Sequence, residues 1–323
     1  MPDSSTTARS PVNGFLNFYK PAGMTSMDAL RRIKRITGQR QKVGHAGTMD
    51  PLAKGVLPIC FGQATRLMDQ ILDSLKRYRV EIELGATTST YDAEGEVVKT
   101  GDPNNITRAD IETALAPFIG LVDQIPPMYS AIKVNGQRLY NLARAGVEVQ
   151  RKARQVEIHD IQVKALALPR VVLIVECGRG VYMRSLAHDL GQALGCGGYV
   201  TDLVRQYSGG FPVEESVTLE QLEEACESPS GWQSYLYPVD WALRDLRSIT
   251  VSPHAEQYLS HGQSIGLGRA DYDAGYLEQF RAYTADGRFL ALVRCDRSAQ
   301  VWRPIKVFQI PTPSPYAPAS SHV

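Results

Sequence analysis

The sequence predicts an α+β protein with a large domain and a smaller second one. Helical and strand-like patterns both occur along the chain, but they do not alternate as regular βαβ units would. With 323 residues the chain has room for about two domains. Hydrophobic residues make up 43% and charged residues 21% of it, which is ordinary for a globular protein and excludes collagen-like and low-complexity classes.

The larger domain is expected over residues 14–245. A helix should follow Ser26, which can cap it, and should stop at Gly38. Residues 77–85 alternate strictly between apolar and charged side chains, as a half-buried strand does. The apolar stripe of the helix is formed by Met27, Leu30, Ile33 and Ile36.

Further elements complete this domain. Thr107 and Asp110 form a capping-box pattern that predicts the start of a helix. Apolar runs predict strands over 156–165 and 170–177, and helical spacing predicts a helix over 183–194 before a glycine. Mixed sheet and helix are therefore expected in one domain.

The smaller domain is expected over residues 246–310. The stretch 227–240 before it is rich in Ser, Pro, Gly and aromatic residues and lacks periodicity, which indicates a boundary. Residues 1–13 are predicted to be a disordered leader, and residues 311–323 form a Pro-rich tail.

Short elements are predicted inside the smaller domain. They comprise a strand over 249–251, a helix that begins after Ser252 and Pro253, and a hairpin that turns at Asp286 and Gly287. A final strand is expected near 301–310. This unit is therefore expected to be rich in β-structure.

Composition also limits location and chemistry. The longest aliphatic run, 171–175, is far shorter than the roughly 18 residues of a membrane-spanning helix, and a secretory signal is not recognisable, so a cytoplasmic protein is expected. The cysteines are odd in number and form no C-x-x-C pair, which disfavours disulfides and zinc and predicts reduced, buried thiols. They are Cys60, Cys177, Cys196, Cys226 and Cys295.

Positive charge is concentrated in two stretches although the formal net charge is only +1. The stretch from Lys20 to Arg66 contains nine basic residues and only two acidic ones. The stretch from Lys133 to Arg154 contains six basic residues, and Glu148 is its only acidic residue. A basic face suits nucleic acid, although solvated helix faces would give the same counts.

Residues 44–55, with the sequence GHAGTMDPLAKG, are the most informative segment. Three glycines permit unusual backbone angles and close approach of another backbone. Pro51 keeps Asp50 out of helical conformation, so this carboxylate is expected on a constrained loop. An aspartate before proline is also a common turn former, and that alternative stays open on spacing alone.

This segment resembles the signature G-H-x-G-x-L-D-P-x-A-x-G of the TruB-type tRNA pseudouridine synthases, with Met49 at the leucine position. The resemblance extends from residue 14 to about residue 211. Arg66 stands where many relatives have lysine, and Val204 where they have arginine. The supporting matches are Lys20-Pro21, Arg77-Tyr78-Arg79, Tyr129-Ser130-Ala131-Ile132-Lys133 with Gly136, Gly178-Arg179-Gly180-Val181-Tyr182-Met183-Arg184, and Leu203 with Arg205.

The resemblance implies a mixed-sheet catalytic domain with a central RNA-binding cleft and, less specifically, a C-terminal PUA-like RNA-binding domain. It also implies the activity: isomerisation of the T-loop uridine (position 55) of tRNA to pseudouridine. The bond from N1 to C1′ breaks and one from C5 to C1′ forms without redox change, so neither a cofactor nor a metal is expected. The protein is expected to bind tRNA. It is also expected to be a monomer without an obligate protein partner.

The resemblance assigns catalytic roles to Asp50, Tyr78 and Arg184. Asp50 serves as nucleophile or stabilises a cationic sugar, Tyr78 stacks on the flipped base and handles the C5 proton, and Arg184 pairs with the carboxylate. From the residues alone, the alternation favours Tyr78 as a core residue of its strand, and Arg184 could be a surface phosphate contact.

Substrate and RNA contacts are expected from the resemblance and the charge pattern. His45 is expected to stack where the base was, unless it is a plain loop residue, and Leu203 to line the uracil pocket, unless it is plain core. Arg151, Lys152 and Arg154 could instead be solvent-exposed residues at the edge of a strand, where basic side chains are common. The expected contacts are His45, Lys20, Arg66, Tyr182, Leu203, Lys133, Arg138, Arg144, Arg151, Lys152 and Arg154.

Two other functions remain open at this point. One is a tRNA-binding or tRNA-folding protein on the same scaffold without catalysis, which the intact Asp50, Tyr78 and Arg184 disfavour. The other is a metal-dependent RNA hydrolase, which the lack of further carboxylates near Asp50 in the sequence disfavours.

Overall fold

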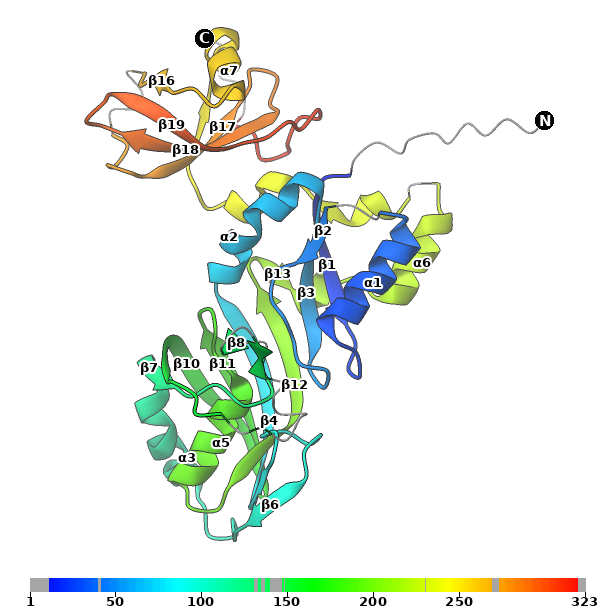
Figure 1. Ribbon diagram of the computed structural model, residues 1–323, viewed down its shortest axis with the longest axis vertical. Helices are drawn as coiled ribbons and strands as arrows, with labels where there is room; N and C mark the ends of the chain where they lie inside the picture. Colours follow the sequence, from blue (N-terminus) through cyan, green and yellow to red (C-terminus); the bar gives the residue numbers. More distant parts are fainter. Residues whose placement is uncertain are drawn as a thin grey trace, which may run out of the picture.

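A ten-stranded mixed sheet forms the centre of the larger domain in the computed structural model, which describes residues 12–39, 42–130, 133–134, 137–139, 147, 149–229, 231–268 and 273–318. The strands run in the order β14-β1-β3-β12-β4-β11-β10-β7, with β2 added to β3 and β13 to β12 (Figure 1). Their bounds are β1 (Gly14–Lys20), β2 (Val43–His45), β3 (Lys54–Phe61), β4 (Lys76–Leu84), β7 (Gly120–Gln124), β10 (Arg154–Ala167), β11 (Arg170–Cys177), β12 (Gly198–Ser208), β13 (Phe211–Pro212) and β14 (Leu236–Tyr237).

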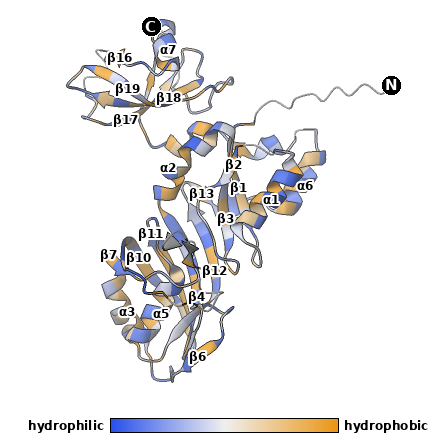
Figure 2. Ribbon diagram, viewed as in Figure 1, coloured by the Kyte–Doolittle hydropathy of each residue, from blue (hydrophilic) through white to orange (hydrophobic). Residues whose placement is uncertain are grey.

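Helices cover this sheet in two groups, one on each half. α1 and α6 pack together beside β1, and α3 and α5 pack together beside β10 and β12 (Figure 1). Polar residues alternate with apolar ones along α1 and α6, as expected of helices that bury one face (Figure 2). The bounds are α1 (Ser26–Thr37), α2 (Met68–Asp73), α3 (Arg108–Leu115), α5 (Met183–Ala193) and α6 (Leu219–Glu227); two short hairpins are formed by β5 (Ala86–Thr88) with β6 (Val97–Thr100) and β8 (Lys133–Val134) with β9 (Gln137–Arg138).

The predicted helices and strands are confirmed, with two corrections in α1. Thr25, not Ser26, caps this helix, because its side chain accepts the hydrogen bond from the Asp28 backbone. Ser26 is inside the helix and buried. Met27 is exposed and does not belong to the apolar stripe, whereas Leu30 and Ile33 are buried.

The two halves of the sheet meet at a short parallel contact between β3 and β12. Only Val204 with Lys54 and Arg205 with Gly55 are paired there, whereas β12 pairs with β4 along most of its length. Gly55 has φ +102°, and a Cβ on it would lie 2.4 Å from the Arg205 carbonyl oxygen. Glycine therefore permits the approach of the two backbones on which the sheet depends.

We expect Gly55→Ala to lower the free energy of unfolding by roughly 3 kcal/mol or more, since the methyl group would push the two central strands apart. Gly23→Ala is the matched control, because Gly23 also has positive φ (+82°) but open space around the missing Cβ. That variant should lose only about 1 kcal/mol. Urea unfolding of both variants checks the difference, and equal losses would contradict the steric argument.

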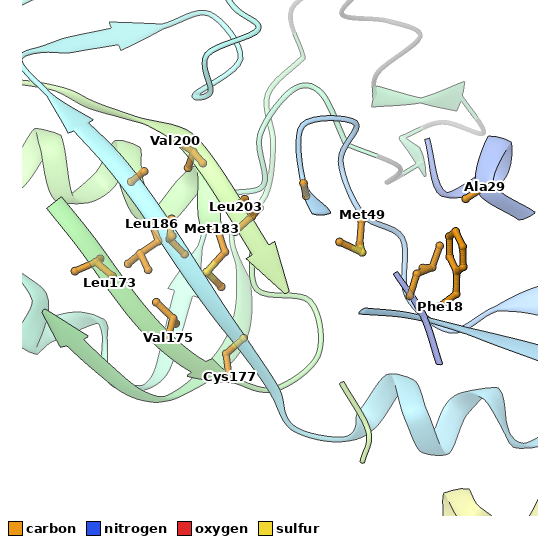
Figure 3. Packing of buried hydrophobic residues seen from close by; sticks show 14 of the residues in the cluster. Phe18, Ala29, Met49, Leu173, Val175, Cys177, Met183, Leu186, Val200 and Leu203 are labelled. Atoms are coloured by element: carbon orange, nitrogen blue, oxygen red, sulfur yellow. The ribbon is translucent and has the colours of Figure 1, made fainter. Parts of the chain in front are cut away.

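One apolar cluster spans both halves of the sheet. Figure 3 shows Leu173 and Leu186 on one side and Phe18 and Ala29 on the other, with Met49 between them. A polypeptide loop that carries Met49 is therefore anchored at the junction of the halves. Four of the cysteines are buried as expected, but Cys226 on α6 is exposed, which corrects the prediction for that residue.

The C-terminal residues form a five-stranded sheet with one helix, which confirms a β-rich second unit. The order is β15-β17-β18-β19-β16. The interpretation of 227–240 as a boundary is wrong, because β14 lies in that stretch and pairs with β1. The bounds are β15 (Ser248–Thr250), β16 (Ile265–Gly266), β17 (Gln279–Tyr283), β18 (Phe289–Asp296), β19 (Val301–Val307) and α7 (Pro253–Ser260).

Buried polar contacts join this sheet to the larger domain. The Asp240 carboxylate is almost fully buried and accepts hydrogen bonds from the Tyr283 hydroxyl at 2.6 Å and from the Ser314 hydroxyl at 2.5 Å. Ser314 belongs to the Pro-rich tail, and Tyr316 of the same tail packs against Trp241. The described part of the tail is therefore built into the contact between the two domains.

Candidate active site

The signature segment forms a loop that leaves β2 and enters β3, and two neighbouring elements, α1 and β1, hold it. The Ser26 hydroxyl on α1 accepts a hydrogen bond from the Met49 N–H at 2.8 Å and donates to its carbonyl. The Lys20 ammonium at the end of β1 donates to the Pro51 carbonyl at 3.3 Å. Asp50 lies between these anchors, so its backbone position is fixed from both sides.

The Asp50 carboxylate makes a bidentate ion pair with the guanidinium of Arg184 on α5. Nε and Oδ2 are 2.9 Å apart, and Nη2 and Oδ1 are 2.7 Å apart. The Arg184 side chain is 3% exposed, whereas that of Asp50 is 30% exposed. The interpretation of Arg184 as a surface phosphate contact is therefore wrong, and the carboxylate is the partner that an incoming molecule can reach.

Sequence reasoning missed a second carboxylate at this arginine. Oδ2 of the buried Asp92, in the turn between β5 and β6, lies 3.5 Å from Nη1 of Arg184. Nη1 also donates to the Thr90 carbonyl at 3.2 Å. Burial raises the pKa of the Asp92 carboxyl above its usual range. In the sequence Asp92 stands in a D-x-x-G turn pattern, and only the fold brings it to Arg184.

A cavity of about 220 Å³ opens beside Asp50. Tyr78 from β4, Tyr182 before α5 and Leu203 from β12 line it together with Asp50. Tyr78 is half-buried and packs against the core cluster, so the core and the pocket interpretations both hold for it; the same is true of the buried Leu203. Burial raises the pKa of both phenols, so they are protonated at neutral pH.

Two predicted RNA contacts are corrected. Lys20 is 0% exposed, and its ammonium donates to the carbonyls of Pro21 and Met24 as well as to the loop; burial lowers its pKa to about 8. Lys20 therefore connects the backbone near Pro21 and Met24 to the loop at Pro51, and it is not exposed to RNA. Arg66 donates to the Val307 carbonyl and lies over the Phe308 ring, so its guanidinium joins the two domains.

His45 ends β2 and is half-buried, just before the loop, but it is not among the residues that line the cavity. In the described structure its Nδ1 is buried without a hydrogen-bond partner. Burial, and then the Arg205 cation, lower the pKa of this imidazole. It is therefore neutral at pH 7, which suits stacking rather than charge pairing.

The second basic stretch is only partly described. Lys133 on β8 and Arg138 on β9 are described in their backbone alone, and Arg144 lies outside the described residues. The Arg151 guanidinium donates to the Pro126 carbonyl at 3.2 Å, and Lys152 is exposed. Arg154 is exposed but pairs with Gln124 of β7, so it does not belong to a sheet-edge strand and the strand-edge interpretation fails for it.

Within the described ranges, groups of three or more His, Cys, Asp or Glu side chains that could hold a metal ion are not found. The same residues contain no helix long and apolar enough to cross a membrane.

Comparisons with known proteins agree along the chain. The family model described as TruB family pseudouridylate synthase (N terminal domain) matches residues 34–183, and that of the tRNA pseudouridylate synthase B C-terminal domain matches residues 184–244. The tRNA pseudouridine synthase B of Dehalococcoides mccartyi is 41% identical over 94% of this chain and 98% of its own length. The protein of that name from Pseudomonas putida strain GB-1 is 43% identical over 88% of this chain and 92% of its own length.

Solved structures show the same fold. A Cbf5 complex with Nop10 and Gar1 contains a chain with a TM-score of 0.69 and 24% identity, over 95% of this chain and 87% of that one. An H/ACA RNP bound to a substrate RNA gives a TM-score of 0.68 and 21% identity, over 94% and 87% of the two chains. At these identities the likeness concerns the fold alone.

Sequence relatives and fold together identify the class: the chain is a pseudouridine synthase, an isomerase that acts on RNA. It belongs to the TruB family of tRNA pseudouridine synthases, whose activity is the formation of pseudouridine in the T loop of tRNA. The sequence resemblance to this family is thereby confirmed.

Proposed function

We propose that Asp50 is the covalent nucleophile that converts the T-loop uridine to pseudouridine. The observation that carries this proposal is the bidentate ion pair with Arg184, which orients a reachable carboxylate at the mouth of an aromatic cavity. The base C6 and the sugar C1′ are its two candidate targets. In the overall isomerisation the N1–C1′ bond breaks, the C5–C1′ bond forms, the C5 proton leaves and N1 gains a proton, so electrons balance without a cofactor.

Tyr78, Tyr182 and Leu203 hold the extruded base. The cavity is recessed below the protein surface and a base in a folded loop is stacked, so the uridine must be flipped out of the RNA to enter. An aromatic face stabilises an unstacked base by about 1–3 kcal/mol. Tyr78 stacks on it, and its hydroxyl handles the C5 proton. His45 stacks in the RNA loop where the base was.

Arg184 acts on the reaction through Asp50. Its guanidinium is buried, binds both carboxylate oxygens and is itself held by Asp92 and the Thr90 carbonyl. A fork-shaped cation that meets both oxygens fixes the plane of the carboxylate as well as its position. This arrangement supports a catalytic role for the pair more than a tRNA-binding function without catalysis.

tRNA binds along the cleft that holds Asp50 and reaches the basic stretch Lys133 to Arg154. Residues 246–310 form a PUA-like RNA-binding domain, the second part of a chain divided near residue 245. The enzyme acts as a cytoplasmic monomer without an obligate protein partner.

The basic stretch gives a testable salt dependence. Replacement of Arg151, Lys152 and Arg154 by glutamine should reduce the slope of log K against log salt by up to about 0.7–0.9 for each phosphate that is no longer neutralised, because fewer counterions are released. The modified uridine should stay the same. A triple glutamine variant of the exposed Lys99, Lys164 and Arg170 controls for net charge. An unchanged slope in the first variant would remove this segment from the RNA interface.

Incubation with an unmodified tRNA transcript, followed by mapping of pseudouridine, tests the proposed function. We expect one modified T-loop uridine, with the same yield in the presence of EDTA. Binding without modification would favour the non-catalytic alternative. Chain cleavage that EDTA abolishes would favour a metal-dependent hydrolase.

A further inference from the structure

A third buried cation of the site, Arg205 on β12, has no role in the proposed function. Its side chain is 2% exposed and lines the cavity. Unlike Arg184, it has no carboxylate within ion-pair distance among the residues that the structure describes. Burial of a cation without a counter-charge is costly, so its position needs a reason.

The contacts of Arg205 join three separate parts of the site. Nε donates to the Val56 carbonyl of β3 at 2.6 Å, and Nη2 donates to the Gly47 carbonyl of the loop at 3.2 Å. Arg205 and Tyr78 also both line the cavity; burial raises the pKa of the Tyr78 phenol, and the guanidinium charge opposes that rise. Arg205 and Tyr78 are register partners on adjacent strands, so their proximity is set by the sheet.

The loop fits closely over the guanidinium. Gly47 has φ +112°, and a Cβ built on it would lie 3.2 Å from Nη1 of Arg205. Arg205 also pairs with Gly55 at the short contact of β3 with β12, so its backbone stands where the two halves of the sheet join. Arg205 thus contacts the loop that carries Asp50 and lies opposite Tyr78 on the adjacent strand.

We propose that Arg205 is a positioning residue for pseudouridine formation, which fixes the Gly47 end of the catalytic loop and the Tyr78 hydroxyl relative to each other. The inference rests on the proposed function, because it assumes that Asp50 and Tyr78 act on the same base. The charge of the guanidinium favours the phenolate form of Tyr78 and so opposes the effect of burial on this phenol. A small misplacement of reacting groups can cost about 10²-fold in rate.

The test compares Arg205→Met and Arg205→Lys, each alone and combined with Tyr78→Phe. Single-turnover rates at saturating enzyme, tRNA dissociation constants and thermal unfolding are measured for each. Lysine keeps the charge but loses the planar fork that reaches several acceptors at once. Arg281→Met is the matched control, because this buried arginine of the C-terminal domain also donates to a backbone carbonyl, that of Leu246, and to a tyrosine hydroxyl, that of Tyr283.

We expect Arg205→Met to slow the single-turnover rate about 100-fold, Arg205→Lys somewhat less, and both to bind tRNA within about twofold of the parent. Arg281→Met should keep the parental rate. Tyr78→Phe alone should cost about 10²–10³-fold. The combined loss should be well below the product of the single losses, because both substitutions remove the same electrostatic interaction between the guanidinium and the phenol.

Three results would overturn the inference: a parental rate in folded Arg205→Met, fully multiplicative losses with Tyr78→Phe, or failure of both Arg205 variants to fold, which would assign a purely structural role. The proposed function fails in a different way. A parental rate in Tyr78→Phe would remove the hydroxyl from the mechanism, whatever the Arg205 variants do.

Discussion

Asp50→Asn is expected to lower the single-turnover rate of pseudouridine formation by roughly 10⁴-fold or more while it still binds tRNA. Asparagine has nearly the same shape but lacks the negative charge and is a poor nucleophile. It can still accept one hydrogen bond from Arg184, so the loop should keep its position. The loss should therefore appear in the chemical step and not in the dissociation constant.

Asp202→Asn is the matched control for this experiment. Asp202 is also 30% exposed and ion-paired, at 2.7 Å to Lys54 and 3.2 Å to Arg79, but it is not among the residues that line the cavity. Its amide variant should keep the rate within about threefold of the parent, as is usual for exposed pairs. A rate for Asp50→Asn within tenfold of the parent would show that another group is the nucleophile.

The loop and its aspartate could be predicted from sequence because their signal is local. The glycines and Pro51 restrict the backbone over a few residues, and the signature around Asp50 is long and specific. The strand of Tyr78 was equally predictable from its period of two. Periodicity could not decide whether Tyr78 faces core or substrate, and in the structure it contacts both.

The electrostatic frame of the site was not predictable, because it depends on which side chains the fold buries. Lys20 and Arg66 were expected to contact RNA because of their charge and the family resemblance. In the structure Lys20 donates to buried backbone carbonyls, and Arg66 bonds a carbonyl of the C-terminal domain. Asp92 carries no local pattern that separates it from an ordinary turn residue. Arg205 belongs to the family match, but nothing local in the sequence indicates its contacts. Each of them contacts residues that are distant in the sequence: Arg184, for example, is 92 positions after Asp92.

Substitution of Arg184 should give the second large effect. Arg184→Lys keeps a cation but cannot bind both Asp50 oxygens and Asp92 together, and we expect a loss of about 10²-fold in single-turnover rate. Arg184→Met removes the charge between two carboxylates and should lose about 10³-fold or more. It should also lower the free energy of unfolding by about 3–5 kcal/mol, because it leaves the buried Asp92 without its cation.

The stability loss in Arg184→Met should depend on pH in a defined direction. Burial already raises the pKa of Asp92, and Arg184 opposes that rise. Without the arginine the pKa rises further, so the folded state holds a proton that the unfolded state releases. The free energy of unfolding then falls as pH rises from the unfolded pKa toward the folded one. The difference between parent and variant should be smaller at pH 5 than at pH 8.

Urea unfolding at both pH values, with Arg288→Met as control, checks this expectation. Arg288 also bridges two carboxylates, those of Glu256 and Asp286, but at a more exposed position in the C-terminal domain. Exposed ion pairs contribute little to stability, and water can solvate Glu256 and Asp286 in the variant. The free energy of unfolding of Arg288→Met should therefore fall by about 1 kcal/mol or less. A loss in Arg184→Met that is equal at pH 5 and pH 8 would mean that Asp92 keeps its charge without the arginine, and that the arginine orients Asp50 without compensating a buried carboxylate.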